Sequence, residues 1–87
     1  IILCGHSHTP FYKEIDDTLF INPGSVGRMF DSNPMTSFGE LFISSNNKID
    51  LQLHRICYPI QDTVNELKKH SLPDIYCKMY LEGKKLN

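Results

Sequence analysis

Residues 11–22, FYKEIDDTLFIN, set the start of the fold, because they encode two short strands joined by a tight turn. Phe11 to Ile15 and Thr18 to Asn22 are rich in aromatic and β-branched residues, which favour strands. Asp16-Asp17 separates the two runs and provides a two-residue connection of the kind found in hairpins. The sequence therefore predicts a β-hairpin over residues 11–22.

The segment before the hairpin, IILCGHSHTP at residues 1–10, opens on an apolar run. Chain termini are usually polar and frayed, whereas residues 1–5 have the character of a buried strand that ends at Gly5. The run has no initiator Met. We therefore expect the 87 residues to be the C-terminal portion of a single longer domain.

The segment after the hairpin predicts a loop and then a second pair of strands. Residues 23–36 have the proline, glycine, serine and asparagine content of a loop. Strands are predicted over residues 37–44 and 49–58, with a turn at Asn46-Asn47. Alternation in the last strand places Ile49, Leu51 and Leu53 on one side, so we expect one buried face and one wet face.

The final third of the chain changes to helical periodicity. Ile60, Val64 and Leu67 recur at the spacing of one helix face. Ser71 and Pro73 begin a second helix, which ends at Gly83 and has an apolar stripe formed by Ile75, Tyr76, Met79 and Tyr80. Residues 84–87 are expected to fray. Strands followed by helices predict an α+β fold, in which helices cover a mainly antiparallel sheet.

Composition excludes several classes of function. A chain of 87 residues with 40% hydrophobic and 22% charged residues makes one small soluble domain. The net charge of −1 gives no nucleic-acid or membrane-binding surface, and no apolar run approaches the ~20 residues that span a bilayer. Three widely spaced cysteines indicate a reducing, cytoplasmic location, with Cys57 and Cys77 expected to be buried.

The histidines of residues 4–10, CGHSHTP, are the candidates for chemistry. In an extended segment His6 and His8 would point to the same side ~6.5–7 Å apart, which suits two imidazoles that each bind one ion of a metal pair. Gly5 would allow a sharp turn before them. Two alternatives stay open at this point, namely ordinary surface histidines and a structural zinc held with Cys4.

The other candidate polar residues are interpreted as structural. His54 lies on the predicted polar face of a strand and His70 at a helix end, so both are expected to be solvated. Arg55 is expected near the rim of its strand. None of the three is assigned a functional role.

Two motifs together resemble a known family. Gly5-His6-Ser7-His8 followed by Pro10 is similar to the GHxH signature of the calcineurin-like metallophosphoesterase superfamily. Residues 17–28, DTLFINPGSVGR, resemble the corresponding segment of its small bacterial and archaeal phosphodiesterases, and the last strand and helices are similar as well. The resemblance covers essentially the whole chain, as the C-terminal part of the family's domain.

The resemblance implies a four-layered α/β/β/α sandwich with a two-metal site. His6 and His8 would each ligate one divalent ion, with manganese expected and iron, zinc or nickel as alternatives. Site support would come from Gly5, Asn22, Gly24 and Ser25, and Arg28 would meet a substrate phosphate. The implied reaction is hydrolysis of a phosphoester, in which a metal-activated hydroxide attacks phosphorus in line.

The sequence departs from the family pattern at several points. The D-x-H, GDxxD and GNH(D/E) motifs of the family are absent, so the chain provides only two of about seven expected ligands. They would belong to a missing N-terminal half of the domain. Met29-Phe30 stands where many relatives have Pro-Arg. We therefore expect the 87 residues alone to be inactive.

Three functional hypotheses follow. The first is an enzyme, a phosphodiesterase or phosphatase, of which this chain carries the GHxH motif. The second is a non-catalytic scaffold of the same fold that acts in protein interaction, although a scaffold has no need of the two intact histidines. The third is a truncated remnant that self-associates through exposed strand edges, which would make it a homo-oligomer.

Overall fold

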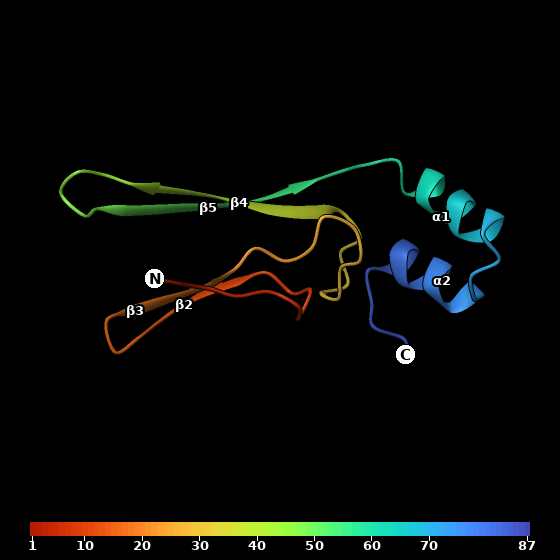
Figure 1. Ribbon diagram of the computed structural model, residues 1–87, viewed down its shortest axis with the longest axis horizontal. Coiled ribbons are helices and arrows are strands. Elements are labelled where there is room, and N and C mark those ends of the chain that lie inside the picture. The colour runs from red at the N-terminus through yellow and green to blue at the C-terminus, as the bar shows by residue number, and fades with distance from the viewer.

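The predicted hairpin is present and forms two of the three strands of the first sheet. A computed structural model describes all residues from 1 to 87. Its elements are β1 (Ile2–Leu3), β2 (Phe11–Ile15), β3 (Thr18–Asn22), β4 (Thr36–Ile43), β5 (Ile49–Ile56), α1 (Ile60–Lys69) and α2 (Asp74–Glu82). Strands precede helices, so the predicted α+β order is confirmed. The expectation that the helices cover a sheet is wrong, because α1 and α2 pack on each other beyond the ends of the strands (Figure 1).

The first sheet has the order β1-β3-β2. β2 and β3 are antiparallel, with Ile15 opposite Thr18, and Asp16 and Asp17 turn the chain at φ 49° and 62°. Positive φ at both positions is typical of a type I′ hairpin turn. β1 runs parallel to β3, and the Cys4 N–H donates to the Ile21 carbonyl at 2.9 Å. This pairing brings the end of β1 beside the end of β3.

The second sheet is an antiparallel ribbon of β4 and β5. Asn47, in the predicted turn, has a φ of 61°. The two sheets lie in separate layers (Figure 1) and face one another across an apolar space of about 320 Å³. Leu3 and Ile21 line this space from one sheet, and Leu41 and Leu51 line it from the other.

The core lies at one end of the molecule, around the loop between β3 and β4. The fully or nearly fully buried residues there are Ile21, Asn22, Met29, Ser37, Val64, Cys77, Met79 and Gly83. The molecule measures 51 × 22 × 19 Å, and its radius of gyration is 15.6 Å. A compact domain of this length would have a radius of gyration of about 12 Å. The shape is extended because the two ribbons project away from the buried loop.

Several expectations about burial are wrong. Ile2 and Leu3 are 47% and 67% exposed, because β1 pairs with β3 on one side only. Leu51 and Leu53 of β5 are half-buried and Ile49 is exposed, because no layer of this chain packs closely on that face. Cys57 is exposed, since it lies in the linker between β5 and α1.

The assignments of His54 and of the α2 stripe also differ from expectation. His54 is half-buried, because its ring stacks on Phe38 directly opposite, with 4.8 Å between ring centroids, and its Nε2 lies 2.7 Å from Glu40 Oε1. His70 is exposed as expected and lies 3.5 Å from Glu66. In α2, Cys77 and Met79 are the buried positions, while Ile75 is at the exposed border.

The helices begin and end near the predicted residues. α1 carries Asp62 in its first turn and Lys68 and Lys69 in its last, which suits the helix dipole. α2 ends at Gly83, whose φ of 65° is left-handed. Neither helix has the length and apolar character needed to cross a bilayer.

Candidate metal centre

The two histidines lie on the loop that follows β1. Both have left-handed backbone conformations, with φ 73° at His6 and 58° at His8, so the extended geometry considered for them is wrong. Their rings nevertheless lie 6.2 Å apart, edge to face. Positive φ is uncommon for residues other than glycine and often marks functional loops. The two rings are therefore about as close as an extended segment would place them, although the backbone is left-handed at both residues.

His8 is held in a defined orientation. Its Nδ1 lies 2.7 Å from the Arg28 carbonyl, and its ring stacks on Phe30 at 4.6 Å. The Phe30 N–H also donates to the His8 carbonyl at 3.1 Å. A carbonyl only accepts, so Nδ1 carries the proton of the neutral ring and the lone pair is left on Nε2. Metal-binding histidines are commonly oriented in this way.

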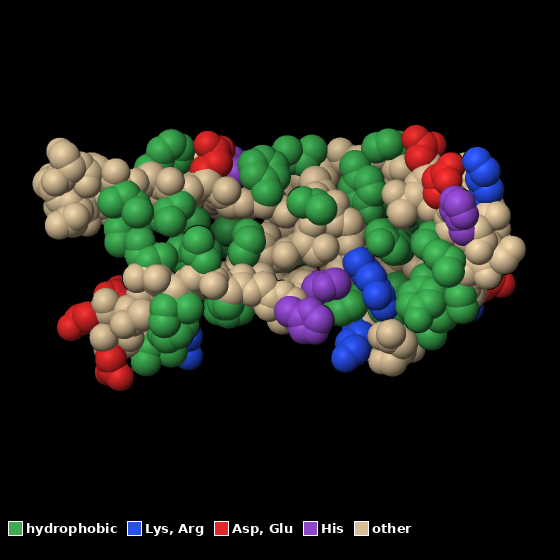
Figure 2. All heavy atoms as spheres, in the orientation of Figure 1, with side chains coloured by type: hydrophobic (Ala, Val, Ile, Leu, Met, Phe, Trp, Pro, Cys, Tyr) green, Lys and Arg blue, Asp and Glu red, His purple; other side chains and the backbone are tan.

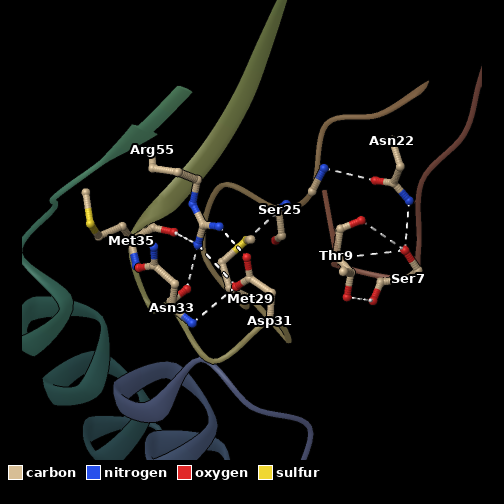
Figure 3. Close-up of polar contacts among 10 residues, drawn as sticks. Ser7, Thr9, Asn22, Ser25, Met29, Asp31, Asn33, Met35 and Arg55 are labelled. Carbon is tan, nitrogen blue, oxygen red and sulfur yellow. Dashed lines mark hydrogen bonds and ion pairs between the residues drawn. The ribbon is translucent and has the colours of Figure 1, made fainter. Parts of the chain in front are cut away.

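Asn22 joins the loop that carries His6 and His8 to the loop that it begins itself, residues 22–25, here called the NPGS loop (Figure 3). The side chain is 1% exposed and lies at the end of β3. Its Nδ2 donates to Ser7 Oγ at 2.8 Å, and its Oδ1 accepts from the Gly24 N–H at 2.9 Å. Both ends of the amide are thus satisfied, which fixes the two loops relative to each other.

Gly24 and Gly5 differ in whether the position can accept a residue other than glycine. Gly24 has a φ of 86°, and a Cβ there would lie 2.9 Å from Ser37 Cβ, so the position needs glycine. The neighbouring Ser25 carbonyl accepts from the Ser37 N–H at 2.9 Å, which attaches the loop to β4. Gly5 has open space around it and no positive φ, so the turn expected there is instead made at His6.

Arg28 provides a positive charge without an acidic partner. Its guanidinium lies 5.6 Å from the centroid of Phe30 and 5.1 Å from that of Tyr76, and Nη2 is 3.3 Å from Met79 Sδ. Its Nε is buried and has no hydrogen-bond partner. The three ion pairs of the molecule all involve other residues. The charge of Arg28 is therefore available to an anion.

These residues surround an open hollow of about 460 Å³. Its lining consists of His6, Ser7, His8, Arg28, Phe30, Lys85 and Asn87. Figure 2 shows lysine and arginine side chains beside the histidines, with no acidic side chain among them. Within these 87 residues the hollow is lined by two cations and two imidazoles and by no aspartate or glutamate, so this side of it has a positive character.

The loop that carries Arg28 is held by Arg55 (Figure 3). The Arg55 guanidinium contacts both oxygens of Asp31 and donates to the carbonyls of Asn33 at 2.6 Å and Met35 at 3.0 Å. Asp31 Oδ1 also accepts from the Asn33 N–H at 3.2 Å. Arg55 is thus an anchor of the loop, because its side chain turns from the strand into the loop's carbonyls.

Acid is expected to weaken this anchor. Burial alone would raise the pKa of Asp31, but the hydrogen bonds from Arg55 and Asn33 and the charge of Arg55 outweigh burial and hold it below 3.8. Since the folded-state pKa is the lower one, ionised Asp31 stabilises the fold above about 3.8, and this contribution disappears as the pH falls through the folded-state pKa.

Urea unfolding of wild type and Asp31→Asn over a pH series measures this effect. At neutral pH, Asp31→Asn should have a lower free energy of unfolding than wild type. Below about pH 3.8, the free energy of unfolding should fall more steeply with decreasing pH in wild type than in Asp31→Asn. Asp50→Asn, at an exposed carboxylate of β5 without an ion pair, is the matched control and should keep the wild-type slope. An acid slope of Asp31→Asn equal to that of wild type would contradict the prediction.

The donor set fits part of a metal site. No group of three or more histidine, cysteine and acidic side chains is assembled. Cys4 Sγ donates to the Ile21 carbonyl at 3.3 Å, toward the sheet, so a closed zinc site with Cys4 is not formed. His6 and His8, with Nε2 of His8 free, are suited to hold metal ions together with ligands from elsewhere.

Sequence reasoning missed three contributors to this region: Phe30, Lys85 and the pair of Arg55 and Asp31. Phe30 was noted only as a departure from a pattern, yet it stacks on His8. Lys85 was placed in a fraying tail. The sequence shows Asp31 in a predicted loop and Arg55 in a predicted strand, 24 positions apart, which does not indicate that the two pair.

Comparison with known proteins agrees with this arrangement. The model of the calcineurin-like phosphoesterase superfamily domain matches residues 1–44, just over half of the chain and the part with both histidines. A "probable metallophosphoesterase" of Methanothermobacter thermautotrophicus is 30% identical over 67 residues, which cover 75% of this chain and 36% of that protein.

A solved structure is similar in fold. The crystal structure of a metallophosphoesterase from Sphaerobacter thermophilus aligns with a TM-score of 0.77 and 24% identity, over 93% of this chain and 41% of that one. At this identity the likeness concerns the fold. The chain thus spans roughly two fifths or less of the length of the relatives that it matches.

Proposed function

The chain belongs to the calcineurin-like phosphoesterase superfamily, and we propose from this that the intact protein is a metal-dependent phosphoester hydrolase, with phosphodiesters as the expected substrates. The observation that best supports the proposal is the orientation of His8. Its Nδ1 is committed to the Arg28 carbonyl, so Nε2 remains as a ligand atom beside His6 and a hollow suited to anions.

In this proposal the two histidines hold a pair of divalent ions, each imidazole contributing to one of them. Such ions would supply Lewis acidity that polarises a phosphoryl oxygen and acidifies water. The Arg28 carbonyl keeps the His8 ring in the tautomer with Nε2 unprotonated. Asn22 keeps the histidine loop and the NPGS loop in register, and so fixes where the imidazoles stand relative to Arg28.

Arg28 is proposed to bind a phosphate oxygen of the substrate. A guanidinium presents several donors in a plane and pairs well with phosphate. Here it rests between Phe30 and Tyr76, two aromatic contacts that limit its motion, and it has no carboxylate to compete for it.

The other members of the proposed metal site lie outside these 87 residues. Two imidazoles carry no negative charge to neutralise two dications, so we propose that carboxylate ligands come from the remaining length that the relatives possess. Manganese is the proposed metal, with iron, zinc and nickel as alternatives. The proposed location is the cytoplasm, which suits three free cysteines.

The test is a hydrolysis assay on the intact protein before and after removal of metal by a chelator. We expect turnover of bis(p-nitrophenyl) phosphate, loss of turnover after chelation, and recovery with one or more of the four metals. The 87-residue chain alone should show no turnover under the same conditions. An intact, folded protein that hydrolyses neither phosphodiesters nor phosphomonoesters with any of these metals would favour the scaffold hypothesis instead.

A further inference from the structure

The C-terminal tail, residues 84–87, takes part in the hollow. The four residues are exposed and lie outside any helix or strand, and Lys85 and Asn87 line the same space as His6, His8 and Arg28. Figure 1 shows the tail turning away from α2 after its last residue. A lysine far from the motifs in sequence is thus placed at the candidate metal centre.

The direction of the tail is set by packing at Gly83. This residue is buried, and its φ of 65° turns the chain out of α2. A Cβ here would lie 2.7 Å from the Asn33 carbonyl carbon and from Pro34 N, and the Gly83 carbonyl accepts from the Ser32 N–H at 2.9 Å. The tail therefore starts from a point held against the loop that carries Arg28.

No side chain of these 87 residues forms an ion pair with Lys85. None of the three ion pairs includes Lys85 or Arg28, and the lining of the hollow contains no aspartate or glutamate. Lys84, the preceding residue, is also exposed but does not line the hollow. The two lysines therefore differ in position and not in chemistry.

We infer that Lys85 is a substrate-binding residue that contacts the anionic phosphoryl group from the side of the hollow formed by the tail. The inference rests on the proposed function, which it deepens by assigning a second cation to phosphate binding. An ammonium group on a flexible stem can follow a phosphate at an open site, whereas Arg28 is restrained by aromatic rings. The two cations would act on the same anion from different segments.

Inorganic phosphate is the probe, titrated by calorimetry into the intact protein as purified, at low ionic strength. We expect Lys85→Gln to raise the dissociation constant for phosphate about fivefold, as for one exposed charge pair. Lys84→Gln, the matched control, should leave it nearly unchanged, and Lys85→Arg should restore most of the affinity. The difference between the two glutamine variants should shrink in high salt.

The outcomes separate this inference from the proposed function. Equal phosphate affinity in Lys85→Gln and Lys84→Gln would overturn the inference, even if the protein hydrolyses phosphoesters. Selective loss of affinity in Lys85→Gln would support it, even if no variant hydrolyses any phosphoester, and the proposed function alone would then fail. In an active protein, Lys85→Gln should also raise KM about fivefold, whereas Lys84→Gln should leave KM nearly unchanged.

Discussion

Replacing His8 with alanine is expected to lower the phosphoesterase rate of the intact protein by on the order of 100-fold or more. The substitution removes the free Nε2 that we propose as a metal ligand. It also removes the Nδ1 contact with the Arg28 carbonyl and the stacking on Phe30. Initial rates at saturating metal, together with metal content after gel filtration, measure the effect.

Two further variants separate ligand loss from loop disturbance. Asparagine at this position, His8→Asn, can still donate from its amide to the Arg28 carbonyl but has no atom where Nε2 lies, so we expect it to be as inactive as His8→Ala. His70→Ala removes an exposed histidine of α1 and should keep the wild-type rate. Recovery of activity in His8→Asn would mean that His8 only supports the loop.

Replacing Gly83 with alanine is expected to lower the free energy of unfolding by about 2–4 kcal/mol. The added methyl group would stand 2.7 Å from backbone atoms of Asn33 and Pro34, which cannot move aside as a flexible side chain could. The residue would also have to adopt a φ of 65°. Urea unfolding, monitored by circular dichroism, gives the change in stability.

The matched control for this prediction is Gly5→Ala, where an added Cβ meets no atom within 4 Å. We expect its midpoint of unfolding to stay near that of wild type. Gly83→Asn relieves the left-handed strain but keeps the same Cβ, so it should remain destabilised. If Gly83→Ala and Gly5→Ala unfold at the same urea concentration, the close contact with Asn33 and Pro34 does not limit this position.

Local structure was predictable where neighbouring residues decide it. Asp16-Asp17 between two β-favouring runs specified the hairpin. Gly83 marked the end of α2, whereas the helix starts at Asp74, after the predicted start at Ser71 and Pro73. The candidate metal-binding pair was equally visible, since His6 and His8 lie in one short motif. Such signals depend on turn geometry, helix spacing and residue chemistry, all of which act over a few positions.

Burial was predicted less well. Leu3 was expected inside and is 67% exposed, while His54 was expected in water and stacks on Phe38. An apolar run indicates that a strand can be buried, but exposure depends on which other segments reach it. β1 has a partner on one side, whereas β4 places an aromatic ring directly opposite His54.

The sequence by itself determined the order of the elements, the hairpin turns, the helix limits and the presence of two imidazoles in one loop. Only the tertiary structure decided that Arg28 fixes the tautomer of His8, that Arg55 anchors the Arg28 loop, and that Lys85 reaches the hollow. The physical reason is sequence separation. These contacts join residues 20 or more positions apart, and such pairs form only when packing brings their segments together.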